Sequence, residues 1–277
     1  MVKKIFLSLL LGFCSISIAK VVIWDLGGVL CATNEWGIIY EFGLFKPFLY
    51  MLFDWKNPAN IQKLLFEILS EIEAPEIENF KLAVTANGTP MPYIVCQYQA
   101  GKKRRPDVIV QAKRYIEQLP ESKFSSAREK ELIIRAVEVT FDPDILAQNT
   151  YMIPEGVALL KEVCAILNAD RFRKNTCITC SNWDAVSFYK FALIHKEIFN
   201  LFEGRIEISG INHLLKPNIQ VYTALLKKYS LTPENCIFID DQEVNVQAAQ
   251  AVGIPSILLK DKNYRALREE LVRREVI

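Results

Sequence analysis

The sequence has almost no excess of charge of either sign. Its 33 lysines and arginines nearly balance its 32 aspartates and glutamates, and the formal net charge is +1. A protein whose main partner is a nucleic acid or an anionic membrane usually carries a clear positive excess. The sequence therefore argues against both partners. It also has no acidic or basic tail, no low-complexity tract and no repeat of solenoid length.

Histidine is scarce, and the cysteines follow no pattern typical of a disulfide framework. There are two histidines, and Cys177 and Cys180 form the one C-x-x-C pair among seven cysteines. No second Cys or His pair is placed to complete a zinc site with them. The pair also lies in an apolar run typical of a strand, where residues three apart face opposite sides. We therefore expect buried free thiols, although the sequence does not settle the disulfide status.

The first 19 residues differ from the rest of the chain. Lys3 and Lys4 precede the apolar run IFLSLLLGFCSISIA, which ends in small residues. This order predicts a signal peptide over residues 1–19, with cleavage after Ala19 and export to the periplasm or the medium. The run is short for a membrane span, which needs about 20 apolar residues, so no stable span is expected after removal. The alternatives are an N-terminal anchor or an additional element of a cytoplasmic protein.

From residue 152 onward, apolar runs typical of strands alternate with amphipathic stretches typical of helices. With 277 residues, 51% of them hydrophobic, the chain can bury a large core. The alternation predicts an α/β fold with a Rossmann-like parallel sheet and helices on both faces. The core is expected at residues 20–32 and 151–277. The predicted strands are 20–25, 175–182, 205–210, 236–241 and 254–261, and the predicted helices are 154–167, 183–199, 216–229, 243–252 and 263–276.

The segment 33–150 lacks this alternation. It contains helical stretches at 61–73 and 127–139, and a less regular patch at 85–107. We predict a mostly helical cap domain over residues 33–150, inserted after the first strand.

Polar residues stand where several predicted strands end. Asp25 follows the run KVVIW, Ser181 and Asn182 follow TCITC, and Asp240 and Asp241 follow CIFI. In open parallel sheets, ligands bind beyond the carboxyl ends of the strands. A buried strand has no need of a charge at its end, whereas a binding or catalytic site does. The sequence thus predicts one site at this edge of the sheet.

These motifs together resemble the haloacid dehalogenase superfamily, in its branch with a helical cap after the first strand. WDLGGVL places Asp25 at the family's nucleophile, and TCSN places Ser181 at its phosphate-binding hydroxyl. Lys216 in SGINHLLKPNIQVY matches the family lysine, and FIDDQEVNVQAAQAVGI follows the fourth motif closely. The resemblance covers residues 20–31 and about 152–262.

The resemblance implies a phosphatase that uses Mg²⁺ and acts on a small phosphorylated molecule. Asp25 and Lys216 would be catalytic, because a carboxylate can form an aspartyl-phosphate and thereby split one hard hydrolysis into two steps. Ser181, Asn182 and Lys216 would bind the phosphate. The metal ligands would be Asp25, the Gly27 carbonyl and Asp240, with Asp241 beside them orienting Lys216 or a metal-bound water.

Gly27 is the main departure from the family pattern. Most family phosphatases have Asp at this position, which protonates the leaving oxygen and then activates water. A related D-L-G-[GN]-V motif occurs in a branch that includes sugar-phosphate phosphatases. We therefore expect a leaving group that needs little protonation, such as an anomeric or acyl phosphate, or an acid supplied by the cap.

Two other functions are consistent with parts of this pattern. A phosphate-binding protein that has lost catalysis would explain Gly27 but not the retention of Asp25, Ser181, Lys216, Asp240 and Asp241. A metal-independent 2-haloacid dehalogenase would also lack Asp at position 27, but the pair Asp240-Asp241 favours a metal. The oligomeric state and the identity of the substrate are left open by the sequence.

Overall fold

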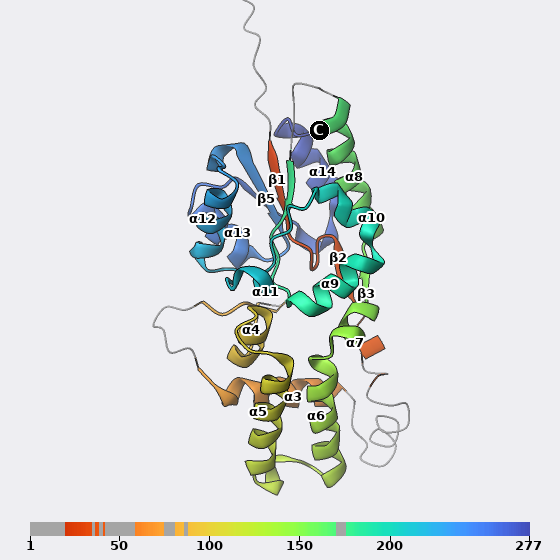
Figure 1. Cartoon of the computed structure of the whole chain (residues 1–277), viewed down its shortest axis with the longest axis vertical. Coiled ribbons are helices and arrows are strands. Elements are labelled where there is room, and N and C mark those ends of the chain that lie inside the picture. The colour runs from red at the N-terminus through yellow and green to blue at the C-terminus, as the bar shows by residue number, and fades with distance from the viewer. Residues whose placement is uncertain are drawn as a thin grey trace, which may run out of the picture.

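The computed structural model consists of a sheet-containing part and a helical part stacked along the long axis of the molecule (Figure 1). It describes residues 20–34, 37–38, 41, 59–74, 81–85, 88–169 and 176–277. The predicted signal peptide over residues 1–19 lies outside the described residues. Within the described ranges, no helix combines the length and apolarity that a membrane span requires.

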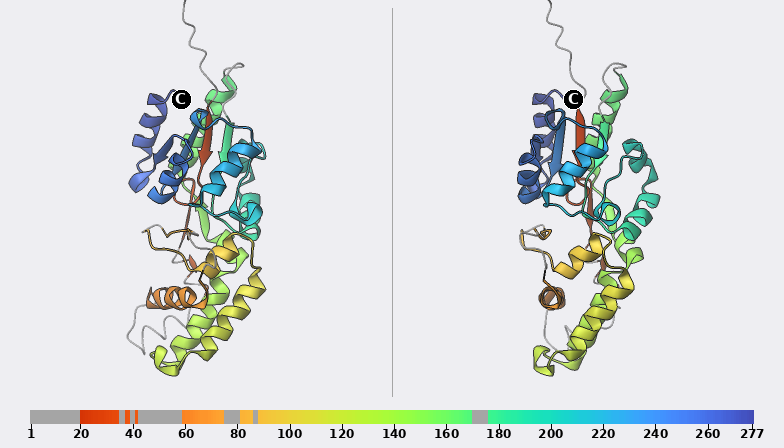
Figure 2. Two further views of the ribbon diagram at one scale, coloured as in Figure 1. Left: turned by 90° about the vertical axis from the view of Figure 1, so that its left-hand side faces the viewer. Right: turned by 60° about the vertical axis from the view of Figure 1, so that its left-hand side comes forward.

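The sheet confirms the predicted α/β fold class. Its four strands are β1 (Val21–Trp24), β4 (Thr176–Thr179), β5 (Cys236–Asp240) and β6 (Ser256–Leu258), in the order β4-β1-β5-β6. All neighbouring pairs are parallel, with Val21 opposite both Thr176 and Cys236. The carboxyl ends of the strands therefore point toward the helical part (Figures 1 and 2).

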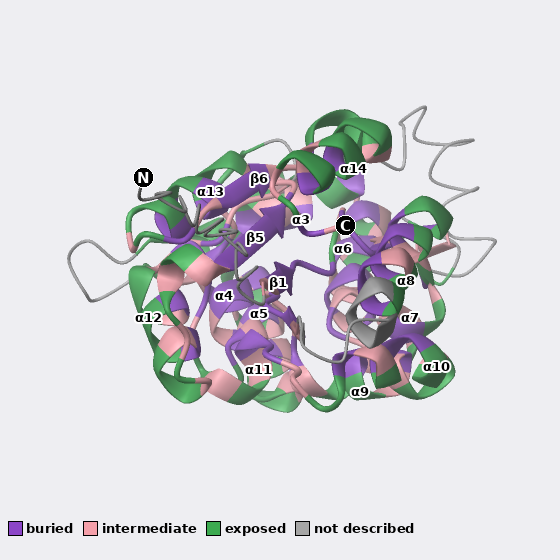
Figure 3. Cartoon of the chain, turned by 90° about the horizontal axis from the view of Figure 1, so that it is seen from above, coloured by how far each residue is buried: buried purple, intermediate pink, exposed green. Residues whose placement is uncertain are grey.

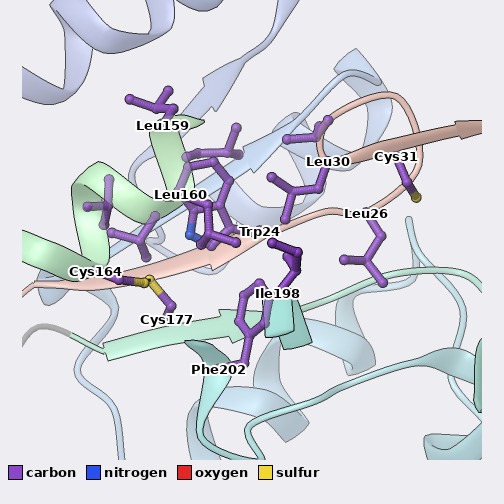
Figure 4. Close-up of a cluster of buried hydrophobic side chains, with 14 of the residues drawn as sticks. Trp24, Leu26, Leu30, Cys31, Leu159, Leu160, Cys164, Cys177, Ile198 and Phe202 are labelled. Atoms are coloured by element: carbon purple, nitrogen blue, oxygen red, sulfur yellow. The ribbon is translucent and has the colours of Figure 1, made fainter. Parts of the chain in front are cut away.

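Helices cover both faces of this sheet. Alternate residues of its strands point to opposite faces, so each strand offers side chains to the helices on both sides. Val22 and Trp24 pack in a cluster with α8 (Pro154–Ala169), α9 (Ala185–Ile194), α10 (Lys196–Phe199) and α14 (Tyr264–Arg273). Figure 4 shows Trp24 in this cluster beside Leu160. Ile23 packs on the other face with α12 (Ile219–Lys228) and α13 (Glu243–Gln250). Figure 3 shows the buried strands with exposed helix surfaces outside them.

Two elements of this part differ from the sequence prediction. Residues 205–210 form no strand, because the chain enters α11 (Ser209–Asn212) after a single bridge between Ser181 and Ile208. The predicted helix 183–199 begins later and is divided at His195, where α9 ends and α10 starts. Asp184 fixes the start of α9, since its carboxylate accepts a hydrogen bond from the Ser187 N–H at 3.0 Å.

The helical part has its own buried cluster. It is built by α3 (Ala59–Ile72), α4 (Tyr93–Gln99), α5 (Arg105–Gln118) and α6 (Ala127–Thr140), whose apolar faces meet around residues such as Ile68, Val108 and Ile133. Helix α4 lies inside the patch that the sequence left irregular. Short 3-10 turns occupy Glu121–Lys123, Asn200–Phe202, Pro233–Asn235 and Lys260–Lys262.

The chain passes between the two parts along a pair of short strands. β2 (Cys31–Thr33) and β3 (Thr150–Met152) run antiparallel, with Thr33 opposite Thr150. Helix α7 (Pro143–Gln148) lies within the segment predicted as cap, but its Ala147 packs in the cluster of the sheet. A pair of neighbouring strands thus holds the helical part over the carboxyl ends of β1, β4 and β5.

Candidate active site

Four of the predicted site residues meet where β1 and β5 end. Asp25 directly follows β1, Asp240 is the last residue of β5 and Asp241 comes next. Carboxylate oxygens of Asp25, Asp240 and Asp241 lie within 4.8 Å of one another. Lys216 lies among them, because its Nζ is 2.9 Å from Asp25 Oδ1 and 2.6 Å from Asp240 Oδ2. One ammonium group thus links Asp25 and Asp240, which are 215 positions apart in sequence.

Asp25 is held by a tight turn. The residue is only 5% exposed, and its Oδ1 accepts a hydrogen bond from the Leu26 N–H at 2.7 Å as well as contacting Lys216. Within the described chain, Asp25 Oδ2 receives no hydrogen bond, so one oxygen of this carboxylate stays available for attack on an electrophile.

Lys216 remains charged despite being 2% exposed. Burial alone would lower the pKa of its ammonium group, but the charges of Asp240 and Asp25 outweigh burial and raise that pKa. The site therefore contains a fixed positive charge at its centre.

Asn182 positions Lys216 through the backbone. Its Oδ1 accepts a hydrogen bond from the Lys216 N–H at 2.9 Å, and its Nδ2 donates to the Lys216 carbonyl at 2.9 Å. Both ends of the Asn182 amide are thus engaged with Lys216. The sequence predicts that the backbone N–H of Asn182 binds the phosphate. In the structure that N–H donates to no described residue, and the role stays a prediction.

Ser181 precedes Asn182 in the chain, and its backbone pairs with the residues at the start of α11. Its N–H donates to the Glu207 carbonyl at 3.1 Å, and its carbonyl accepts from the Ser209 N–H at 3.0 Å. Its hydroxyl makes no hydrogen bond to any described residue. The backbone of Ser181 is thus fixed while its hydroxyl remains free to bind an anion.

Asp240 is fully buried and tied to the start of α13. Its Oδ1 accepts from the Gln242 N–H at 2.8 Å, and Asn245 Nδ2 donates to both of its oxygens at 3.0 and 3.1 Å. Burial raises the pKa of Asp240 to about 7; Lys216 opposes this shift and the charge of Asp25 adds to it. Asn245 was missed from the sequence, although it lies within the fourth motif, five residues after Asp240.

Asp241 has an oxygen suited to an additional ligand. Burial, reinforced by the charge of Asp25, raises its pKa to about 6. Its Oδ1 is buried and has no hydrogen-bond partner among the described residues. The sequence allowed Asp241 to orient Lys216, but the ion pair of Lys216 is with Asp240 and Asp25.

This group of carboxylates fits a hard divalent cation. Three negative side chains face one ammonium group, and one buried oxygen is unpaired. Oxygen ligands of this kind are what Mg²⁺ prefers in proteins. Asp25, Asp240 and Asp241 could hold such an ion, and Gly27 follows Asp25 in the same turn.

Gly27 and Gly28 meet opposite constraints in that turn. Gly28 has φ +75°, and a Cβ added there would lie 2.0 Å from Asp241 Oδ2. A Cβ at Gly27 would meet no heavy atom within 4 Å. Position 28 thus requires glycine for the approach to Asp241. Position 27 has room for a side chain that the sequence does not supply.

A cavity of about 340 Å³ adjoins the site on the side of the helical part. Gly27, Gly28 and Ser181 form its floor, while Met91, Val95 and Tyr98 cover it from α4 and the residues before it. The site is therefore a pocket shared by the two parts of the chain.

Comparison with known proteins identifies relatives of this arrangement. The family model of haloacid dehalogenase-like hydrolases matches residues 19–253. Sesquiterpene phosphatase astK of Aspergillus oryzae is 36% identical over 81 residues, which are 29% of this chain and 40% of that protein. Bifunctional epoxide hydrolase 2 of Rattus norvegicus is 31% identical over 96 residues, which are 34% of this chain and 17% of that protein. The chain thus matches less than half the length of either relative.

Solved structures share the fold at low sequence identity. A HAD-like family hydrolase from Porphyromonas gingivalis has a TM-score of 0.54 at 16% identity, covering 93% of this chain and 99% of that one. A HAD family enzyme from Bacteroides thetaiotaomicron has a TM-score of 0.51 at 15% identity, covering 87% and 93%. Together with the family match over most of its length, this fold shows that the chain belongs to the haloacid dehalogenase-like hydrolases.

Proposed function

We propose that the protein is a magnesium-dependent phosphatase that hydrolyses a small phosphomonoester through an aspartyl-phosphate on Asp25. The observation that carries this proposal is the Lys216 ammonium group, buried between the carboxylates of Asp25 and Asp240. A fixed cation beside a carboxylate with one free oxygen suits attack on an anionic phosphoryl group.

The relatives support the same activity. The Aspergillus oryzae protein is described as a sesquiterpene phosphatase. The Bacteroides thetaiotaomicron enzyme has the same fold. Its structure in complex with magnesium and inorganic phosphate matches this chain with a TM-score of 0.50. Neither relative identifies the substrate of this chain.

In the first step, Asp25 Oδ2 attacks phosphorus and the bond from phosphorus to the ester oxygen breaks. The ester oxygen takes up a proton from solvent or from the cap side, because Gly27 supplies none, and leaves as an alcohol. Lys216 and the Ser181 hydroxyl donate hydrogen bonds to the phosphoryl oxygens, and Asn182 keeps Lys216 in place through its backbone. Water then attacks phosphorus, which releases phosphate and restores the Asp25 carboxylate.

Mg²⁺, held by Asp25, Asp240, Asp241 and the Gly27 carbonyl, would neutralise the negative charge that phosphate adds to this group of carboxylates. Asn245 and the Gln242 N–H keep Asp240 oriented toward Lys216. Gly27 offers no acid, so the substrate must have a leaving group that needs little protonation or must receive its proton from the cap side.

Phosphate release from a panel of phosphomonoesters tests this proposal. The panel contains alkyl esters, sugar 1-phosphates and acyl phosphates, each assayed with Mg²⁺ and with a chelator, beside Asp25→Asn. We expect release that requires both Mg²⁺ and Asp25, with a preference for good leaving groups. If the folded protein binds Mg²⁺ and inorganic phosphate but releases nothing from any ester, it is a binding protein in which Gly27 replaced the catalytic acid.

A further inference from the structure

We infer that the group attached to the phosphate is apolar and aliphatic rather than a sugar, joined either as an alkyl ester that receives its proton from the cap side or as an acyl phosphate that needs little protonation. This inference rests on the proposed phosphatase function and concerns the cavity that adjoins the same site. Residues of both parts of the chain line the cavity, so a group attached to the phosphate would contact both parts.

The cavity wall is mainly hydrocarbon. Met91 and Val95 face it from the cap side, Phe141 from the end of α6, Leu146 from α7, and Cys31 and Trp183 from the sheet part. All six have mainly apolar side chains, and five different segments of the chain contribute them. Such a wall stabilises a ligand in proportion to the apolar surface that the ligand removes from water.

Trp183 presents its ring to this cavity in a fixed orientation. Its Nε1 donates a hydrogen bond to Ser187 Oγ at 2.8 Å, and its ring stacks on Phe191 with centroids 5.2 Å apart. The single polar atom of the indole is thus already paired, so only its carbon surface is offered to a ligand.

Most polar side chains at the cavity are also paired within the protein. Asp184 accepts hydrogen bonds from Ser187, and Thr150 Oγ1 donates to the Leu146 carbonyl at 2.7 Å. The Tyr98 and Thr33 hydroxyls make longer contacts of 3.4 Å, to the Phe141 carbonyl and to Thr150 Oγ1. Gln99 Oε1 is buried and has no partner among the described residues, and the Thr140 hydroxyl makes no hydrogen bond there either.

A sugar would therefore leave most of its hydroxyl groups unpaired in this cavity. Gln99 and Thr140 offer partners for one or two hydroxyls, whereas a hexose carries several. Each polar group buried from water without a partner weakens binding by roughly 5- to 150-fold. An aliphatic chain has no such penalty and gains from contact with the same wall.

Gly27 joins this cavity to the nucleophile. It lines the cavity, and a Cβ at this position would meet no heavy atom within 4 Å. The carbon next to the ester oxygen can thus pass over Gly27 while the phosphate stays beside Asp25, Ser181 and Lys216.

A series of straight-chain primary alkyl phosphates tests the inference. Butyl, hexyl, octyl and decyl phosphate, together with glucose 6-phosphate, are all esters of primary alcohols, so contact with the cavity is the main variable. We expect kcat/KM to rise roughly three- to fourfold per methylene until the cavity is full, with glucose 6-phosphate below the longer chains.

Variants of the wall locate the effect. Val95→Thr and Met91→Gln nearly preserve side-chain volume but add polar atoms, so the ratio of kcat/KM for octyl over butyl phosphate should fall several-fold. Val110→Thr is the matched control, because Val110 is 55% exposed on α5 and does not line the cavity. That variant should keep the wild-type ratio.

The outcomes separate this inference from the proposed function. Hydrolysis of all esters with no dependence on chain length, or a preference for glucose 6-phosphate, would overturn the inference and leave the phosphatase intact. If no ester is hydrolysed, the phosphatase proposal fails. The inference is then decided by calorimetry, in which octylphosphonate should bind the folded protein more tightly than methylphosphonate, and equal affinities would refute it.

Discussion

Adjacent glycines in the first turn have different physical roles. Gly28 adopts φ +75° and leaves space for Asp241, where any side chain would collide. Gly27 faces open space on the cavity side of Asp25. Packing therefore does not exclude an acidic side chain at position 27.

Restoring an acid at this position should therefore increase activity. We expect Gly27→Asp to fold normally and to raise kcat for simple alkyl phosphates by about 10²-fold or more, because a placed general acid is typically worth 10²–10⁴ in rate. Gly27→Ala is the control, since it fits the same space without an acid. Equal kcat values for the two variants would show that the acid comes from elsewhere.

Asn182 offers a test of how Lys216 is positioned. Asn182→Ala removes both hydrogen bonds to the Lys216 backbone, so we expect kcat/KM to fall by about 10-fold or more, in line with ~1–3 kcal/mol for buried groups left unpaired. If Asn182 acts through Lys216, the double variant Asn182→Ala, Lys216→Met should have nearly the same kcat/KM as Lys216→Met alone. Losses that multiply would instead indicate an independent role.

Part of the candidate site could be predicted from sequence because its residues stand at the ends of apolar runs, whereas Lys216 was predicted only through the family resemblance. Asp25, Ser181 and Asp240 carry this local signal. The function of the Asn182 side chain could not be predicted, because it depends on contact with a residue 34 positions away in sequence. Asn245 was missed for a different reason: it lies only five residues after Asp240, but its contact depends on how the first turn of α13 directs its amide back to the strand end.

At the scale of elements, local signals predicted helix ends better than helix continuity. Gly253, at φ +83°, follows the predicted helix 243–252 and closes the turn after α13: the Ile254 N–H donates to the Ala249 carbonyl at 3.1 Å, and the Gly253 N–H donates to the Gln250 carbonyl at 2.9 Å. The division of the 183–199 stretch and the presence of α4 had no such signal. Both depend on packing between elements that are distant in sequence.

The packing of α8 on β4 brings Cys164 and Cys177 together, with their sulfur atoms 3.5 Å apart (Figure 4). All six cysteines in the described chain are free and buried. Burial raises the pKa of the Cys180 thiol to about 12 and those of Cys96 and Cys236 to about 11, so their reactive thiolate forms are scarce at neutral pH.

We therefore expect a Cys14→Ser chain to react with a charged thiol reagent only after unfolding. Absorbance should show six thiols reacting per chain in denaturant and almost none in the folded protein. Any slow reaction should begin at Cys164, because the hydrogen bond with Cys177 lowers the pKa of its thiol. Rapid modification of several thiols in the folded chain would contradict this arrangement.

For the whole molecule, the helical part and the sheet part each have a large hydrophobic cluster of their own. Among the described residues they meet through one small shared cluster, in which Leu215 packs on the helical part, and through polar contacts. Ser209 Oγ donates to the Gln99 carbonyl at 2.7 Å, and Asn218 pairs with the Lys81 backbone at 2.8 and 3.1 Å. The β2–β3 pair completes the connection. The parts should consequently differ in stability, because local unfolding follows the units that share buried contacts.

A truncation in the cap cluster tests this separation. Ile133 is fully buried among the helices of the cap, so Ile133→Ala should destabilise that part by about 2–5 kcal/mol. Hydrogen exchange should then show faster exchange in α3, α5 and α6, while β1, β4 and β5 keep their protection. Mg²⁺ binding should persist because the carboxylates lie on the sheet, whereas hydrolysis should fall because α4 covers the cavity. Equal loss of protection in both parts would instead show that the cap and the sheet unfold as one cooperative unit.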